Sequence, residues 1–161
     1  MRKLTVAFLA VLLLSAACSS IDCPVENVVS TTYGLYTADG DPDTLTDTLT
    51  VYTTMANGED SIVLNMDYDI ASFTLPISYT NDGDTFIFVR YSDIVVAYDS
   101  VVIAKENTPH FESVDCQVSY FHNLTGVKWT NGGIDSIVIV NPFVSYDSSV
   151  EHFHIYFKAE L

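Results

Sequence analysis

The sequence predicts an all-β fold, a single antiparallel β-sandwich of about 8–10 strands that occupies residues 27–161. After Cys18 no stretch shows a sustained helical period, and runs of β-branched and aromatic residues recur between turn residues. The chain is 48% hydrophobic with 10 Tyr and 9 Phe, which is enough apolar side chain for a core. Short strands at this spacing favour a two-layer sandwich over a barrel.

The first strand is expected within Asn27–Thr37. In Asp47–Thr54 apolar and polar residues alternate, which gives a second strand with one apolar face. Asn57-Gly58 is a strong hairpin signal, so the third strand should return beside the second with Ile62 and Leu64 on one face.

A strand is expected around Phe73–Tyr79. It contains Pro76, which lacks an amide donor, so it should lie at a sheet edge or be bulged. A tight turn leads into Thr85–Tyr91, whose continuous apolar character predicts burial on both faces. The segment Ile94–Ala104 forms either one long strand or two strands broken near Asp99.

Three further strand signals follow. The alternating residues of the first should share one face and turn Cys116 inward; they are Val114, Cys116, Val118 and Tyr120. Asn131-Gly132-Gly133 should join a strand ending at Val127–Thr130 to one over Ile134–Val140 as a hairpin. Trp129 should pack in or beside the core.

The last strand lies within Val150–Ala159. Its side chains divide between two faces, with Phe153, Ile155 and Phe157 on one and His152, His154 and Tyr156 on the other.

The start of the chain has the three parts of a bacterial lipoprotein signal. Arg2 and Lys3 precede the apolar run Leu4–Leu14, which is too short to span a bilayer as a helix, and Ala16-Ala17-Cys18 follows. We expect residues 1–17 to be the signal peptide, Cys18 to carry lipid such as palmitate, and residues 18–26 to be a lipidated tether. The protein would then be lipid-anchored at the outer membrane, periplasm-facing or surface-exposed. The alternative is an ordinary secretory peptide with a chance cysteine.

The chain carries 21 Asp and Glu against 6 Lys and Arg, a formal net charge of −15. Such a chain repels phosphate polymers, so nucleic acid is a poor candidate partner. A solvated acidic surface is the simplest interpretation, while cationic partners and divalent ions stay open. The expected partners are the membrane, through the lipid anchor, and an unidentified envelope protein.

Three cysteines are present. If Cys18 carries lipid, Cys23 and Cys116 remain as an even pair in an oxidising compartment, which predicts a disulfide between them. The alternative is two buried free thiols.

Three short motifs occur in order across nearly the whole chain that follows the signal segment. They are Asp22-Cys23-Pro24, Ser113-Val114-Asp115-Cys116 and Glu151-His152-Phe153-His154-Ile155-Tyr156-Phe157. In order and separation they resemble an uncharacterised family of Bacteroidetes-type lipoproteins, a domain of unknown function that is DUF6452-like. The resemblance implies a β-rich envelope lipoprotein and no activity. Gln117 departs from the glycine expected after Cys116.

Two patterns are weak candidates for metal binding, and no cofactor is expected. His152 and His154 are two apart on a strand, a spacing that zinc sites on sheets use, but two surface histidines explain the pattern more simply. Asp39, Asp41 and Asp43 alternate in the exposed loop Ala38–Asp43, as calcium ligands sometimes do, yet the EF-hand pattern fails.

Asp followed by Ser or Thr and an aliphatic residue resembles the O-glycosylation sequon of Bacteroidetes envelope proteins, although many strands begin with the same pattern. The candidate hydroxyls are Thr44, Thr48, Ser61, Ser100 and Ser136. We expect at most one or two to be used, above all Thr44.

No Gly-x-Ser-x-Gly motif occurs, so no nucleophilic catalytic residue is predicted. The sequence therefore favours a cell-envelope lipoprotein with a non-catalytic binding, assembly or structural role. A calcium-dependent or glycan-binding module is the alternative, and an enzyme comes third.

Overall fold

The computed structural model describes residue 23 and residues 28–55 and 57–159, which form ten strands and no helix. The strands are β1 (Ser30–Leu35), β2 (Thr48–Thr54), β3 (Asp60–Asp67), β4 (Ser72–Pro76), β5 (Gly83–Tyr91), β6 (Val96–His110), β7 (Ser119–Trp129), β8 (Ile134–Ile139), β9 (Phe143–Val144) and β10 (Phe153–Phe157). In this part of the chain no helix is long and apolar enough to cross a membrane.

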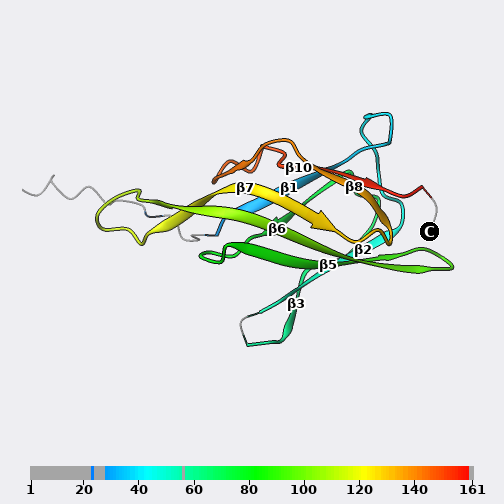
Figure 1. Ribbon diagram of the computed structural model, residues 1–161, viewed down its shortest axis with the longest axis horizontal. Helices are drawn as coiled ribbons and strands as arrows, with labels where there is room; N and C mark the ends of the chain where they lie inside the picture. Colours follow the sequence, from blue (N-terminus) through cyan, green and yellow to red (C-terminus); the bar gives the residue numbers. More distant parts are fainter. Residues whose placement is uncertain (1–22, 24–27, 56, 160–161) are drawn as a thin grey trace, which may run out of the picture.

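Two sheets pack face to face along the long axis of the molecule (Figure 1). One has four strands in the order β4-β1-β10-β8, and the other has six in the order β3-β2-β5-β6-β7-β9. The β1–β10 pair is parallel, which is feasible because these strands come from opposite ends of the domain and no short connection joins them. The pairs on either side of it are antiparallel. The predicted β-sandwich is confirmed.

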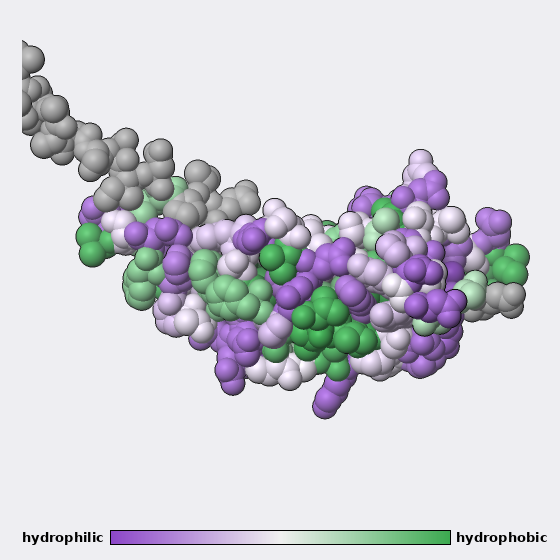
Figure 2. Space-filling model, turned by 90° about the horizontal axis from the view of Figure 1, so that it is seen from above, coloured by the Kyte–Doolittle hydropathy of each residue, from purple (hydrophilic) through white to green (hydrophobic). Residues whose placement is uncertain are grey.

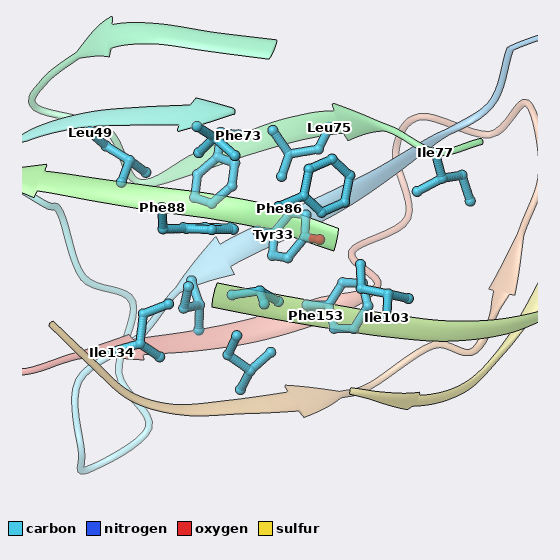
Figure 3. Close-up of a cluster of buried hydrophobic side chains, with 14 of the residues drawn as sticks. Tyr33, Leu49, Phe73, Leu75, Ile77, Phe86, Phe88, Ile103, Ile134 and Phe153 are labelled. Atoms are coloured by element: carbon cyan, nitrogen blue, oxygen red, sulfur yellow. The ribbon is translucent and has the colours of Figure 1, made fainter. Parts of the chain in front are cut away.

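An aromatic cluster centred on Tyr33 fills the space between the sheets (Figure 3). The Tyr33 ring stacks between Phe73 and Phe153, with centroid distances of 4.9 and 4.8 Å, and meets Phe88 edge-on at 6.2 Å. Burial raises the pKa of the Tyr33 hydroxyl, so this residue stays a neutral core aromatic. Such pairs stabilise the core beyond the area that they bury.

The structure confirms some predictions for the edge strands and contradicts one. Pro76 ends β4, which lies at the edge of the four-stranded sheet as predicted. Gly58 has φ 82° in the predicted turn between β2 and β3. The predicted apolar face of β3 is wrong, because Ile62 is 52% exposed while Val63 and Leu64 both pack against the core. Register shifts in the β2–β3 pairing break the strict alternation.

β6 is one continuous strand of 15 residues and does not break at Asp99. It pairs with β5 over its first part and with β7 up to His110, so it runs nearly the length of the six-stranded sheet. The buried Asp99 is accommodated because backbone amides from a neighbouring turn bind its carboxylate.

That turn is the glycine pair between β7 and β8, and the predicted hairpin there is wrong. β7 belongs to the six-stranded sheet and β8 to the four-stranded sheet, so the turn carries the chain from one layer to the other. The Asp99 carboxylate accepts hydrogen bonds from the amides of Gly132, Gly133 and Ile134 and from the Thr130 hydroxyl. A Cβ on Gly132 would lie 2.3 Å from the Tyr98 carbonyl oxygen, so only glycine fits this approach.

The strand predicted around Cys116 is also wrong at its start. Residues 111–118 form a loop between β6 and β7, in which Val114 is 98% exposed and Cys116 is half-buried. Apolar alternation indicated a strand here, but the segment pairs with no strand among the described residues. We call residues 111–118 the tip loop.

Candidate functional site

A disulfide joins Cys23 to the tip loop. The Cα atoms of Cys23 and Cys116 are 5.5 Å apart and the bond closes a separation of 93 residues. The predicted disulfide is confirmed and the alternative of free thiols is wrong. The signal peptide (residues 1–17), the lipidation site Cys18 and the remainder of the tether to residue 26 lie outside the described residues.

A cleft of about 540 Å³, within the usual size of ligand sites, lies at the other end of the sandwich. It is bounded by the segment from Leu35 to Thr46, by the end of β10 and by Arg90. Arg90 pairs with Ala97 near the start of β6, whereas the tip loop follows the end of that strand. At about 3.3 Å per residue, β6 separates the cleft from the tip loop by roughly 45 Å, and Figure 1 shows the C-terminal end far from the tip loop.

Arg90 fixes one wall of the cleft. Arg90 as a whole is 8% exposed. Its guanidinium donates from Nε to Asp47 at 2.7 Å and from Nη1 to the Lys158 carbonyl at 2.6 Å, and lies 5.7 Å from the Phe157 ring centroid. A buried guanidinium needs such partners, and these bonds tie β5 to the C-terminal end of β10. The positive charge of Arg90 is therefore largely paired with groups inside the fold.

Aromatic and acid–base side chains form a rim beside the cleft. The Tyr36 hydroxyl donates to Glu151 Oε2 at 2.9 Å, and the Tyr36 ring stacks on His154 with centroids 3.9 Å apart. His154 Nε2 lies 3.4 Å from the same carboxylate oxygen. The hydrogen bond to Glu151 raises the pKa of Tyr36. A Cβ on Gly34 would lie 2.8 Å from the Glu151 carboxyl group, so glycine makes room for this arrangement.

His152 does not share the surface of His154, and the predicted solvent-facing histidine pair is wrong. His152 precedes β10, is 1% exposed, and accepts the Thr32 amide through Nδ1 at 3.0 Å. Burial lowers the pKa of His152, and Asp147 acts in the opposite direction. The two histidines therefore do not converge on one zinc ion.

The calcium candidates Asp39, Asp41 and Asp43 lie in the exposed loop, as expected. Asp43 Oδ1 accepts the Thr44 amide at 2.8 Å, and the loop closes through the Thr37 amide and the Asp41 carbonyl. Across the described ranges, no group of three His, Cys, Asp or Glu side chains could hold a metal ion.

The glycosylation candidates differ in accessibility. Thr44 is exposed and lines the cleft, whereas the others are half-buried within strands: Thr48, Ser61, Ser100 and Ser136. Asp99, which precedes Ser100, is 3% exposed and bound to the glycine turn. Thr44 is therefore the most accessible of the five.

A buried polar network near the start of β5 was not predicted from the sequence. The Lys105 ammonium donates to the carbonyls of Ser78 and Asn81 and to Asn107 Oδ1, at 2.9, 2.6 and 2.8 Å. Nδ1 of His122 lies 2.7 Å from Asn107 Oδ1. Burial, followed by the charge of Lys105, lowers the pKa of His122 to about 4. The signal available in the sequence was Lys105, a lysine directly after the valine- and isoleucine-rich segment Ile94–Ala104.

We assign this network a structural role and not a ligand-binding one. Burial lowers the pKa of Lys105, while Asp84 and Asp82 oppose that change. Asp84 Oδ2 lies 3.9 Å from Nζ. The cation holds the turn before β5 against β6 at the place where the β6–β7 register shifts.

Comparisons with known proteins give one family and no individual relative. Residues 48–157 match the model of a family of unknown function, DUF6452. Searches of curated proteins and of solved structures found no match. The match spans β2 to β10 and includes Cys116, Glu151 and His154. The chain therefore belongs to the DUF6452 family.

Proposed function

We propose that this protein is a lipid-anchored component of the bacterial outer membrane, periplasm-facing or surface-exposed, whose β-sandwich binds a partner without catalysing a reaction. One observation carries the proposal. The disulfide fixes Cys23, five positions after Cys18, at one end of the sandwich, and the cleft lies at the other end. Lipid at Cys18 would thus present the cleft away from the bilayer.

The chemistry of the rim supports binding over catalysis. Nucleophilic catalysis would need a serine, threonine or cysteine beside His154. The His154 ring contacts the Glu151 carboxylate and the Tyr36 ring. The Tyr36 hydroxyl already donates a hydrogen bond to Glu151, so these two groups are partners of one another.

Removal of the lipidated thiol tests the anchor. A Cys18→Ala variant should move from the membrane fraction to the soluble fraction, because two or three acyl chains hold a protein firmly and their loss removes the anchor. A Ser20→Ala variant keeps the cysteine and should stay membrane-bound. Membrane retention of Cys18→Ala with unchanged mobility would overturn the proposal.

A glycan-binding module is the second candidate, and the lining of the cleft favours it. Tyr36, Tyr156 and Phe157 bring aromatic rings to the cleft, and Thr37 and Thr46 bring hydroxyl groups. Aromatic rings can pack on the apolar face of a sugar while hydroxyl groups exchange hydrogen bonds with it.

Titration with a panel of neutral oligosaccharides, followed by protein NMR, tests this candidate. Chemical-shift changes should be confined to residues of the cleft and should disappear in Tyr156→Ala. Tyr68 is 68% exposed, follows β3 and does not line the cleft, so Tyr68→Ala should bind normally. Equal binding by both variants would exclude the cleft as the oligosaccharide-binding site. Repeating the titration and a thermal scan with calcium and with EDTA tests the calcium-dependent alternative.

A further inference from the structure

The tip loop exposes two large apolar side chains. Phe111 is 65% exposed and Val114 is 98% exposed. In the space-filling view, apolar side chains show at the end of the molecule where this loop lies (Figure 2). Exposed apolar side chains also occur at the other end of β6, at Ile94, Val95 and Val96, so the disulfide beside the tip loop is what distinguishes this end as a contact surface.

The disulfide determines what this surface can meet. Cys116 lies in the tip loop and holds Cys23 at 5.5 Å between Cα atoms. Cys18 is five positions before Cys23 in the sequence, and an extended chain spans at most about 3.5 Å per residue. Lipid on Cys18 therefore brings the tip loop within roughly 20 Å of the bilayer surface.

Aromatic residues form a pair and a group of three on the sandwich just behind the tip loop. Tyr79 and Tyr120 meet edge-on at 5.0 Å, and the Tyr79 hydroxyl donates to the carbonyl of Val118 in the loop. The ring centroid of Phe121 lies 5.1 Å from that of Tyr146 and 5.8 Å from that of Phe143, which is 57% exposed. We call the five aromatic residues the aromatic collar: Tyr79, Tyr120, Phe121, Phe143 and Tyr146. Tyrosine, with an apolar ring and a polar hydroxyl, is enriched where proteins meet the membrane interface.

We propose that the tip loop inserts Phe111 and Val114 into the headgroup–acyl boundary of the bilayer that holds the lipid anchor, with the aromatic collar at headgroup level. This inference rests on the proposed lipid anchoring. A second contact beside the acyl chains fixes the tilt of the domain and keeps the distal cleft turned away from the bilayer.

The charge of the loop selects the kind of membrane. Glu112 and Asp115 flank the apolar residues, and the Glu112 carboxylate lies 2.9 Å from His110 Nε2. With a net charge of −15 on the chain, anionic headgroups repel this end. Insertion should therefore be deeper in zwitterionic than in anionic bilayers.

Tryptophan fluorescence in vesicles tests the inference. The lipidated full-length protein is reconstituted in phosphatidylcholine vesicles with or without bromine on the acyl chains. Trp129, the native tryptophan, ends β7 far from the tip loop and serves as an internal control. Val114→Trp places a probe at a 98% exposed position, and Ile94→Trp places one at an 89% exposed position beyond the other end of β6.

Brominated lipid should quench the fluorescence of the added tryptophan in Val114→Trp and should leave the fluorescence of Trp129 and of the added tryptophan in Ile94→Trp unchanged. Binding to vesicles should also shift the emission of the tryptophan at position 114 to shorter wavelength. Replacing half of the lipid with phosphatidylglycerol should reduce the quenching. Both substitutions lie outside the core, and peptide mapping of the Cys23–Cys116 bond confirms that each variant is folded. Vesicle-bound, lipidated Val114→Trp that is not quenched, or equal quenching of Ile94→Trp, would overturn this inference alone. Protein without lipid would overturn the proposed function as well.

Discussion

Replacing Asp99 with asparagine should be among the most damaging single changes in this protein. Asp99 is 3% exposed, and its carboxylate accepts four hydrogen bonds. Gly132 and Thr130 donate to Oδ1 at 2.6 and 3.0 Å. Gly133 and Ile134 donate to Oδ2 at 2.6 and 2.9 Å. Asparagine keeps one acceptor oxygen and points an NH₂ group either at the amides of Gly133 and Ile134 or at the Gly132 amide and the Thr130 hydroxyl.

The expected loss follows from the one or two amides that face the NH₂ group and lose their acceptor. Each buried N–H that is left without an acceptor costs about 1–3 kcal/mol, and the remaining bonds lose their charge assistance. Asp99→Asn should therefore lower the free energy of unfolding by about 3–5 kcal/mol, a large part of the 5–15 kcal/mol typical of a domain. The change also loosens the turn that joins the two sheets.

Urea unfolding at pH 7, followed by the fluorescence of Trp129, measures this loss. Trp129 ends β7, and its Nε1 donates to the Asp135 carbonyl just beyond the same turn. Asp93→Asn makes the same chemical change at an exposed position and should stay within about 0.5 kcal/mol of the natural protein. A loss below about 1 kcal/mol for Asp99→Asn, with an unchanged urea dependence, would refute the argument that this carboxylate organises the turn.

Three further changes have predictable outcomes. The double variant Cys23→Ser, Cys116→Ser should lose at most about 4–5 kcal/mol of unfolding free energy, the chain-entropy value for a 93-residue separation, and equal urea midpoints would contradict this. Lys105→Met leaves the acceptors of the ammonium group unpaired and should cost about 3–5 kcal/mol, whereas Met in place of the exposed Lys128 should be neutral in the same assay. The pKa of His122 is about 4 in the folded protein and 6.5 ordinarily, so the unfolded chain binds the extra proton and stability falls as pH drops from about 6.5 through about 4. Between pH 7 and pH 5 the free energy of unfolding should fall by at most about 2 kcal/mol because of His122. The lowered pKa of His152 adds to this loss in the same direction. His122→Gln should therefore reduce the difference between the urea midpoints at the two pH values.

Local patterns predicted most strands correctly because they depend on neighbours in the sequence. Alternation around Phe73 and Leu75 places these side chains on one face, and both are buried. The same logic failed at Val114, because alternation reports the suitability of a segment for a strand and a strand also needs a ladder partner. The glycine pair after Trp129 signalled a turn correctly, but a turn signal does not say whether the chain stays in one sheet.

The candidate site was less predictable than the fold. His152 and His154 have the spacing of surface neighbours, yet His152 lies outside β10 and turns inward to bind the Thr32 amide. Tyr36 and Glu151 are 115 residues apart, and their contact follows from the parallel pairing of β1 with β10. No local pattern specifies such a pairing.

The sequence by itself determined that the domain is a β-sandwich, since side-chain alternation and turn residues are local properties of the chain. It also indicated the cysteine pair, because only Cys23 and Cys116 remain once Cys18 is assigned to lipid. The tertiary structure alone decided which strands share a sheet, where the cleft lies, and that Asp99 is buried. Those features depend on contacts between residues far apart in the chain, such as Asp99 with Gly133, whose free energy is realised only when both sheets are assembled.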